Sequence, residues 1–313
     1  MNNRRMALVA GLGVVELWVV GMMIRSVGGG HDANFPGRPQ DPFAAGASGL
    51  AARGGRTAKT FETGAAPHVV ISDDEAALTI SVRPGTTVDV REDRRIGGWF
   101  HGSRPRLNIE KTADGLSITQ AGDGISVAFG SVQRRLDVVV PPATRIEVKA
   151  AASIAASGLR SAATLHSNDG SIDVSDQHGA LTLRTDNGRI ELHDVDAPSV
   201  DVGSDNGRVL LDRVRADRVS IATEDGRIDV VRSLLLGGKI RTDSGRIRLG
   251  LDSKSNVTVN ARASSGRVSV EPPLVLVGGG DGADAPATIR VGGGAGRLDV
   301  GSDDGSIAVA GGA

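Results

Sequence analysis

The chain has 313 residues, enough for one large domain or two ordinary ones, and its formal net charge is −1. A nearly neutral charge balance gives no electrostatic case for a nucleic-acid partner or an acidic substrate. The 44 glycines, the 2 % of aromatic residues and the absence of tyrosine are typical of many short strands joined by tight turns. The absence of cysteine excludes disulfides, thiolate metal sites and a cysteine nucleophile.

Residues 1–27 are predicted to form a transmembrane anchor. Arg4 and Arg5 precede an apolar run at residues 7–24, which would extend about 27 Å as a helix, close to the roughly 30 Å of a bilayer core. Glu16 near its centre costs about 2.5–3.5 kcal/mol on insertion, which the surrounding apolar side chains offset. The two arginines predict a cytoplasmic N-terminus and an extracytoplasmic remainder in a single-pass protein.

A cleaved signal peptide is the alternative for this segment, because Ser26, Val27 and Gly28 offer small residues near a cleavage point. Arg25 directly after the apolar run and the lack of an A-x-A pattern favour the uncleaved anchor. Residues 28–56 are rich in Gly, Pro, Ala and Arg and show no periodicity. They are predicted to be a flexible linker.

Residues 57–160 contain strand-like stretches with irregular turns, for example residues 78–82 and 136–140. Their alternating apolar residues predict amphipathic strands, and no helical period stands out. We expect this region to form the first coils of a repetitive fold, or a β cap over its open end, because terminal repeats are usually atypical.

One segment of this region, residues 94–106, is predicted to be a loop that binds a partner. Its four arginines surround a Trp-Phe pair, and these residue types are favoured at binding hot spots and membrane interfaces. An envelope protein, another surface partner or lipid head groups are the expected partners, and a Trp-Phe plug over the first coil is the alternative. The candidate residues are Arg94, Arg95, Trp99, Phe100, Arg104 and Arg106.

Residues 161–313 repeat one phrase, first clear as TDNGRIEL at residues 185–192. Its glycine recurs at spacings of 18, 19, 19, 19 and 21 residues, and a period near 19 is typical of a solenoid. The Asn-Gly and Asp-Gly pairs predict a turn with positive φ, since Gly carries no Cβ and Asn or Asp tolerates that region. The predicted turn glycines are Gly170, Gly188, Gly207, Gly226, Gly245 and Gly266.

Apolar residues flank each turn with a period of two. In the copy around Gly188 they are Leu183 before the turn and Ile190 and Leu192 after it, with polar residues between. Each repeat therefore predicts two strands with one buried face each, and a short apolar position such as Val195 suggests a third side. At about 3.3 Å per residue, a 19-residue circuit measures roughly 63 Å, which suits a narrow tube.

The nearly identical register of the repeats favours parallel stacking, in which equivalent residues of successive repeats lie over one another. The predicted fold is therefore all-β: a single-stranded parallel β-helix, or solenoid, with coils of about 19 residues, preceded by one transmembrane helix. An antiparallel meander of hairpins is the alternative. Near the C-terminus, Gly296 and Gly305 are only nine residues apart and follow a Gly- and Asp-rich insertion. This departure predicts a loop and a closing hairpin or cap.

The strand at residues 136–140, its following Pro141 and the glycine phrases between residues 166 and 270 resemble a bacterial domain family of unknown function whose members are named putative adhesins. The resemblance covers about residues 65–309. It implies an envelope-associated β-solenoid, often behind a membrane anchor, and it supplies no catalytic residues. With the anchor, it places the expected protein in a bacterial cell membrane with an extracytoplasmic β domain.

The repeated charges have two interpretations. Arginines such as Arg189, Arg208 and Arg227 occupy one phase, and acids such as Asp186 and Asp205 stand three residues earlier. Stacked about 4.8 Å apart, each set becomes a ladder of like charges. The arginines form either a stripe that binds a polyanion or, together with the acids, a self-compensated solvated corner.

No pattern for catalysis or metal binding accompanies the repeat. The six histidines are scattered, no G-x-S-x-G, H-E-x-x-H, Walker or EF-hand pattern exists, and no aromatic residue follows Ser131. We therefore predict a non-enzymatic structural or binding protein with no cofactor, no metal and no small-molecule substrate. A polysaccharide-active β-helix enzyme and a self-assembling envelope scaffold are the alternatives.

Overall fold

The computed structural model describes residues 53–100, 106–121, 127–150, 152–279 and 286–311. The predicted anchor at residues 1–27 and nearly all of the predicted linker lie outside these ranges. Within them the chain is built from strands, and none of its helices is long and apolar enough to cross a bilayer. These ranges belong to one compact unit, which begins at Leu50.

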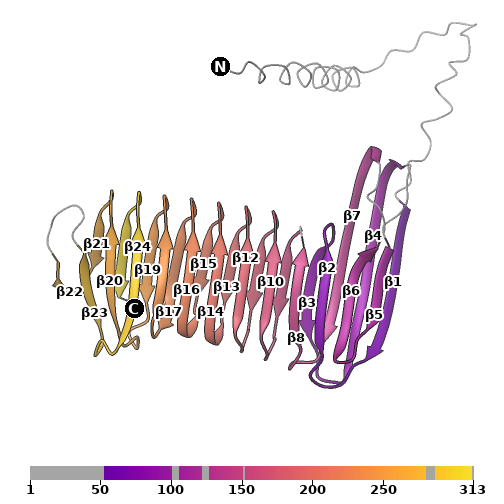
Figure 1. The fold of residues 1–313 in the computed structure, drawn as a ribbon, viewed down its shortest axis with the longest axis horizontal. Helices are drawn as coiled ribbons and strands as arrows, with labels where there is room; N and C mark the ends of the chain where they lie inside the picture. The colour runs from indigo at the N-terminus through magenta and orange to yellow at the C-terminus, as the bar shows by residue number, and fades with distance from the viewer. Residues whose placement is uncertain (1–52, 101–105, 122–126, 151, 280–285, 312–313) are drawn as a thin grey trace, which may run out of the picture. The chain divides into compact units, whose positions relative to one another are not determined.

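The repeats form a solenoid in which each coil gives one strand to each of two parallel sheets, here called sheet A and sheet B (Figure 1). Leu183 pairs with Val202 in sheet B and Ile190 pairs with Val209 in sheet A, so neighbouring coils are related by 19 residues. These parallel pairs confirm the coil and exclude the antiparallel meander for the repeats.

The regular coils occupy the middle of the stack. Their strands in sheet B are β2 (His68–Asp73), β8 (Arg145–Ala150), β10 (Ala163–Ser167), β12 (Leu181–Thr185), β14 (Asp196–Ser204), β16 (Arg215–Thr223) and β18 (Gly238–Thr242). In sheet A they are β3 (Ala77–Val82), β9 (Ile154–Ser157), β11 (Ile172–Ser175), β13 (Ile190–His193), β15 (Val209–Asp212), β17 (Ile228–Leu235) and β19 (Ile247–Leu251). A short third ladder continues sheet B at residues 196–197, 215–216 and 234–235.

The core is a set of apolar ladders inside the coils. Ile172, Ile190, Val209, Ile228 and Ile247 follow one another in register, and all of them are fully buried. Burial of each such side chain stabilises the fold by about 1.5–3 kcal/mol. The alternation in the sequence predicted these inward positions correctly, because side chains of a strand point to opposite faces in turn.

The conformation predicted for the glycine turn is wrong. None of the six turn glycines has a positive φ; the glycine is required because a β-carbon on Gly188 would lie 1.9 Å from the carbonyl oxygen of Gly170 in the preceding coil. Positive φ occurs at the opposite corner of the coil, at Asp176, Asp194, Arg213 and Arg232.

A buried hydroxyl closes five of the six glycine turns, those at Gly170, Gly188, Gly207, Gly226 and Gly245. Thr185 is 2 % exposed, and its Oγ1 accepts a hydrogen bond of 3.0 Å from the Gly188 amide. The same bond recurs from Gly207 to Ser204 at 2.9 Å. The asparagine between hydroxyl and glycine joins neighbouring coils, since Asn206 Nδ2 donates to Asn187 Oδ1 at 3.0 Å. Close backbone approach and side-chain bonds between coils therefore explain the phrase.

Antiparallel strands cover the N-terminal end of the solenoid. Sheet A continues from β3 through β7 (Val127–Val140) and β4 (Thr87–Phe100) to β1 (Arg53–Glu62). Sheet B continues from β2 through β6 (Gly115–Ala121) to β5 (Arg106–Lys111). Because β6 and β7 run parallel to β2 and β3, residues 57–160 contribute three coils and an antiparallel cap made of β5, β4 and β1. The coil of β2 and β3 lies between the coil of β6 and β7 and the coil of β8 and β9, out of sequence order.

The C-terminal end is also built out of sequence order. The coil made of β24 (Gly296–Ser302) and β25 (Ile307–Gly311) lies between the β18–β19 coil and the coil of β20 (Val257–Ala263) and β21 (Val268–Glu271). Beyond β20 come β23 (Ala287–Val291) and β22 (Val275–Gly278), both antiparallel to their neighbours. The predicted closing hairpin is formed by β22 and β23, on either side of the Gly- and Asp-rich insertion, whereas Gly296 and Gly305 belong to a full inserted coil.

Candidate anion-binding site

The site begins with the antiparallel pairing of β4 and β7, which brings two arginine-rich stretches together. Arg94 lies opposite Arg134, Asp93 opposite Arg135, and Arg95 opposite Gln133. Because side chains alternate along a strand, Glu92 and Arg134 face inward and Arg95 and Arg135 face outward.

Arg134 is the centre of a buried ion cluster beneath this surface. Its residue is 4 % exposed, Asp73 is 2 % exposed and Glu92 is 8 % exposed. Arg134 Nη2 lies 3.0 Å from Asp73 Oδ2, and Arg134 Nε donates to Glu92 Oε1 at 3.0 Å. Charges this deeply buried are tolerated only when paired and hydrogen-bonded. The cluster therefore holds β4 and β7 to the turn that follows β2.

That turn also positions a carboxylate at the rim of the site. Asp73 Oδ1 accepts hydrogen bonds from the backbone amides of Glu75 at 3.0 Å and Ala76 at 2.9 Å. The Glu75 carboxylate, 37 % exposed, reaches Arg134 Nη1 only at 3.9 Å. It is held near the arginines by a long contact, and it lies open to solvent.

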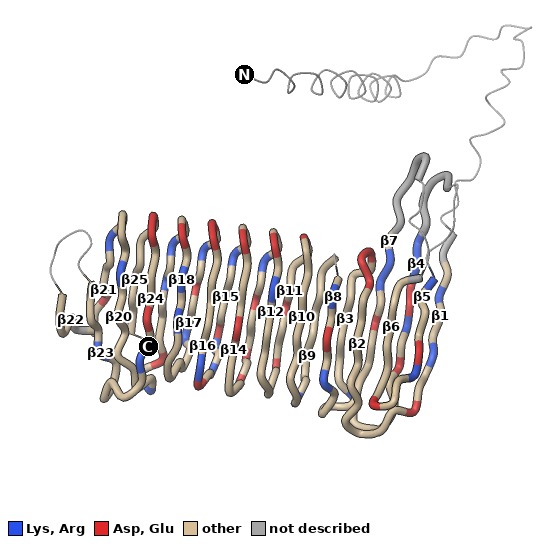
Figure 2. Tube along the Cα trace, in the orientation of Figure 1, with Lys and Arg blue, Asp and Glu red and all other residues tan. Residues whose placement is uncertain are grey.

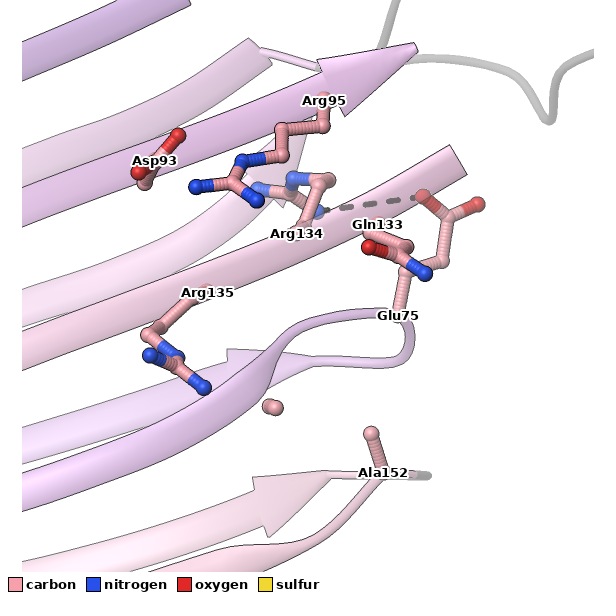
Figure 3. Close-up of a pocket in the computed structure, with 8 residues that line it drawn as sticks. Glu75, Asp93, Arg95, Gln133, Arg134, Arg135 and Ala152 are labelled. Carbon is pink, nitrogen blue, oxygen red and sulfur yellow. Dashed lines mark ion pairs between the residues drawn. The ribbon is translucent and has the colours of Figure 1, made fainter. Parts of the chain in front are cut away.

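Next to the cluster is a hollow of about 410 Å³ that is lined by charged side chains and by the small side chains of two alanines. Ala77 and Ala152 leave room beside the strands, and Figure 3 shows the side chains of Arg95 and Arg135 lining the same hollow from β4 and β7. The lining residues are Glu75, Ala77, Asp93, Arg95, Gln133, Arg134, Arg135 and Ala152.

Two of the three arginines in the hollow have no carboxylate partner in the described ranges. Asp93 pairs with Arg56 at 3.3 Å, and no ion pair or hydrogen bond joins the side chain of Arg95 or Arg135 to any described residue. Guanidinium groups offer parallel N–H donors that match carboxylate and phosphate oxygens. The hollow can therefore receive an anionic group between Arg95 and Arg135.

The charges around the hollow nearly balance. Five arginines (Arg56, Arg94, Arg95, Arg134 and Arg135) accompany four carboxylates (Asp73, Glu75, Glu92 and Asp93). Because the sum is only one positive charge, long-range attraction of an anion is weak and direct hydrogen bonds must provide most of the binding energy. Such a site selects by geometry, so it suits a phosphate or carboxylate presented at close range.

The structure changes the predicted binding loop. Residues 94–100 belong to strand β4 and Arg106 begins β5, so most of the predicted loop is strand, while Arg104 lies outside the described ranges. The backbone is extended because β4 pairs with both β1 and β7. Arg95 lines the hollow and Arg94 lies opposite the buried Arg134; for Trp99 and Phe100 the structure places the backbone in β4.

Sequence reasoning missed Asp73, Glu75, Arg134 and Arg135. Arg134 and Arg135 form a second Arg-Arg pair. The placement of Arg134 opposite Arg94, and of Arg135 opposite Asp93, follows only from the pairing of strands about 40 residues apart. A search for two arginine pairs on neighbouring predicted strands would have suggested the site.

The arginine stripe on the solenoid is paired with nearby acids in part: Arg189, Arg208 and Arg297 form ion pairs, whereas Arg227, Arg246 and Arg267 form none with described residues. Arg189 Nε lies 3.1 Å from Glu191, and Arg208 Nη2 lies 2.8 Å from Asp229. Among the described residues, no ion pair involves the acids of the turn tips, so the acids between inward positions provide the partners. Figure 2 shows acids at successive tips beside the cations. This arrangement favours the solvated corner over a polyanion stripe.

A Ser-His-Asp series on sheet A lacks the geometry of a catalytic triad. Ser175, His193 and Asp212 are neighbours on β11, β13 and β15. His193 Nδ1 lies 3.7 Å from Asp212, too far for a hydrogen bond, and Asp212 is paired with Arg213 at 2.6 Å and Arg232 at 2.7 Å. No group of three or more metal-ligating side chains is found within the described part of the chain.

Comparisons with known proteins agree with this architecture. The family model described as Toastrack DUF4097 matches residues 68–277, which confirms the resemblance to a bacterial family of unknown function. Among proteins with curated descriptions, none matches the chain.

Three solved structures with a similar chain path come from species of Parabacteroides. A putative adhesin from Parabacteroides distasonis is 12 % identical over 82 % of this chain and 97 % of its own, with a TM-score of 0.48. A putative adhesin from Parabacteroides merdae is 12 % identical over 82 % and 96 %, with a TM-score of 0.47. A putative lipid binding protein from Parabacteroides distasonis is 9 % identical over 81 % and 96 %, with a TM-score of 0.42. Identities this low leave the ligand of the present chain open.

Proposed function

Because the chain belongs to the Toastrack DUF4097 family, we propose that it is a non-enzymatic, adhesin-like binding protein of the bacterial cell envelope. Residues 1–27 anchor it as a single-pass protein, and its β-solenoid lies outside the cytoplasmic membrane. The solenoid holds a phosphate or carboxylate group of an envelope component in the hollow between β4 and β7. The observation that supports this role most directly is the pair Arg95 and Arg135, which lack a carboxylate partner among the described residues.

The position of the hollow within the fold is consistent with this role. It lies on the strands that cap the N-terminal end of the solenoid, and β1, the first described strand after the linker, pairs with β4. The buried Arg134 cluster beneath it fixes both strands, so Arg95 and Arg135 are carried on a rigid support. The backbone positions of the two arginines are therefore set before an anion binds, which lowers the entropic cost of binding.

The test is a titration of the full chain, in detergent micelles, with inorganic phosphate and separately with acetate. The readout is the nitrogen-15 NMR signal of the arginine Nε–H groups. We expect the Arg95 and Arg135 signals to shift with saturation, and we expect Arg95→Gln and Arg135→Gln each to abolish the shift of the other arginine. Comparison of the two anions separates phosphate from carboxylate binding.

The matched control is Arg227→Gln. Arg227 is exposed, lies on the solenoid and forms no ion pair with described residues. Like Arg95 and Arg135 it has an unpaired guanidinium group, but it does not line the hollow. Phosphate and acetate should shift Arg95 and Arg135 in this variant as in the unaltered chain. If, in the unaltered chain, the signals of Arg227 and Arg95 shift to the same extent, the binding is nonspecific and the proposed site is wrong.

A further inference from the structure

The two sheets of the solenoid end at different levels at the C-terminal end. Sheet B continues from β20 through β23 to β22, whereas sheet A stops at β21, level with β20. Within the described residues, β21 pairs only with β25 and β22 pairs only with β23. The end is therefore a step, two strands high, with one free strand edge at the bottom and one at the top.

The inner side of this step is apolar and incompletely covered. Val268 and Val270 of β21 are only partly buried, although Ile307 and Val309, their partners in β25, are fully buried. In β22, Leu276 lies opposite the buried Ile289 and is 39 % exposed. The cause is the missing part of sheet A: no strand of the described chain lies across from β23 and β22.

We propose that a second copy of this chain fills the step. A two-fold axis parallel to the strands places sheet B of one copy in line with sheet A of the other. The β22 strand of each copy then lies against the β21 edge of its partner, and both steps are filled at once. A step of two strands always fits its own two-fold image, so the interface is self-complementary in the way that a closed dimer requires.

Strand direction and length agree with this pairing. β21 follows β20 around the coil and runs opposite to it, whereas β22 is antiparallel to β23 and β23 is antiparallel to β20. β22 therefore runs opposite to β21, and a two-fold axis along the strands preserves that relation. Each new ladder is antiparallel and joins two four-residue strands. Pro272 and Pro273, which lack amide donors, limit it to that length.

The opposite end of the solenoid is protected against the same association, which favours a dimer over a filament. On the edge strand β1, Lys59 lies opposite the buried Val90, so a charged side chain occupies an inward position. Arg56 and Glu62 add further charge to the same strand. Inward charges on an edge strand prevent the addition of another strand. The inference does not depend on the anion-binding site, which lies at that protected end.

The absence of cysteine from the chain permits a specific cross-linking test. Two full-length variants with different tags, Val270→Cys and Leu276→Cys, are produced together in membranes and oxidised. Because Val270 and Leu276 face the same interior, we expect a disulfide between the two differently tagged chains. Val268→Cys replaces Val270→Cys in a second pair, so that both registers that keep apolar side chains inward are tested. Failure of both pairs to form the mixed dimer overturns the proposal.

The size of the complex provides the second measurement. For the full chain in detergent, the protein mass should reach twice the chain mass and stop there, whereas larger species would indicate a filament and overturn the closed dimer. Leu276→Lys should return the mass to that of one chain. Val231→Lys is the matched control, because Val231 is 38 % exposed and lies on β17, away from the step. Equal effects of the two lysines would contradict the proposed interface.

Discussion

The carbonyl oxygen of Gly170 lies 1.9 Å from the position that a β-carbon on Gly188 would occupy. The relation repeats along the solenoid: the corresponding separation is 1.8 Å from Gly207 to the oxygen of Gly188 and 2.0 Å from Gly226 to that of Gly207. Gly188, Gly207, Gly226 and Gly245 thus each lie directly over the glycine of the preceding coil. The repeated phrase maintains a stacking distance that no other residue permits.

Gly207→Ala should therefore destabilise the solenoid. The new methyl group would meet the Gly188 oxygen and, at 2.4 Å, Ser204 Oγ, so the coils must separate locally. We expect a loss of about 1–3 kcal/mol in the free energy of unfolding, the usual cost of overpacking, measured by urea denaturation. Gly301→Ala is the control, since its β-carbon would have Arg241 Cγ at 3.8 Å as its nearest neighbour. Equal losses in both variants would contradict the close-approach argument.

At the corner opposite the glycine turn, stability should depend on how well the residue tolerates a positive φ. Arg232 has a φ of 47°, a left-handed conformation that costs about 1–2 kcal/mol for residues with a β-carbon and most for β-branched ones. Arg232→Val should be less stable than Arg232→Gly by about that amount in thermal and urea unfolding. Arg241→Val, on the outer face of strand β18, should leave stability nearly unchanged. Valine and glycine of equal stability at position 232 would exclude strain there.

Removal of the buried cation should be costly. Arg134→Met leaves Asp73 and Glu92 buried without their partner, and breaking a buried pair in this way usually costs about 3–5 kcal/mol. Adding Glu92→Gln should restore part of this loss, because one of the two uncompensated charges is removed. Urea unfolding of the single and double variants gives the coupling directly. Additive losses would show that Arg134 and Glu92 do not interact.

Acid should weaken the attachment of the edge strand β1. Thr60 Oγ1 donates a 2.7 Å hydrogen bond to Asp89, and this bond, followed by one from Arg83, lowers the pKa of Asp89 below its ordinary value of 3.8. A lowered pKa stabilises the fold at pH values above the ordinary value, and the contribution is lost as pH falls through the lowered pKa.

Asp89→Asn should therefore reduce stability at neutral pH and show a smaller further loss at about pH 2–3 than the unaltered chain. Urea midpoints at pH 7 and at low pH measure the difference. Asp217→Asn is the control, because Asp217 is exposed and forms no ion pair among the described residues. If Asp89→Asn loses as much stability at low pH as the unaltered chain does, Asp89 is not a source of the acid sensitivity.

The fold was largely predictable because its signals are local and repeated. Ile190 and Leu192 alternate with polar residues, and the 19-residue spacing to Val209 and Leu211 identifies the partner strand. The reason for the turn glycine was wrong, because an Asn-Gly pair is compatible both with positive φ and with close approach of two chains.

The candidate site was only partly predictable. Arg94 and Arg95 attracted attention as a cluster of charge near Trp99 and Phe100, yet the partners of the site lie elsewhere in the chain. Asp73 and Arg134 are 61 residues apart, and the sequence around them does not indicate that they meet. Their contact depends on the pairing of β4 with β7 and of β7 with β3.

The sequence by itself determined the coil: which residues face inward, where the chain turns and that like residues stack, since these depend on a period of two within a period of 19. Only the tertiary structure decided how the coil ends. Insertion of β24 and β25 beneath β20 and β21, the unequal ends of the sheets and the burial of Arg134 all depend on contacts between distant segments. The apolar pattern of a strand is the same whichever neighbour it pairs with, so the order of the strands follows from packing.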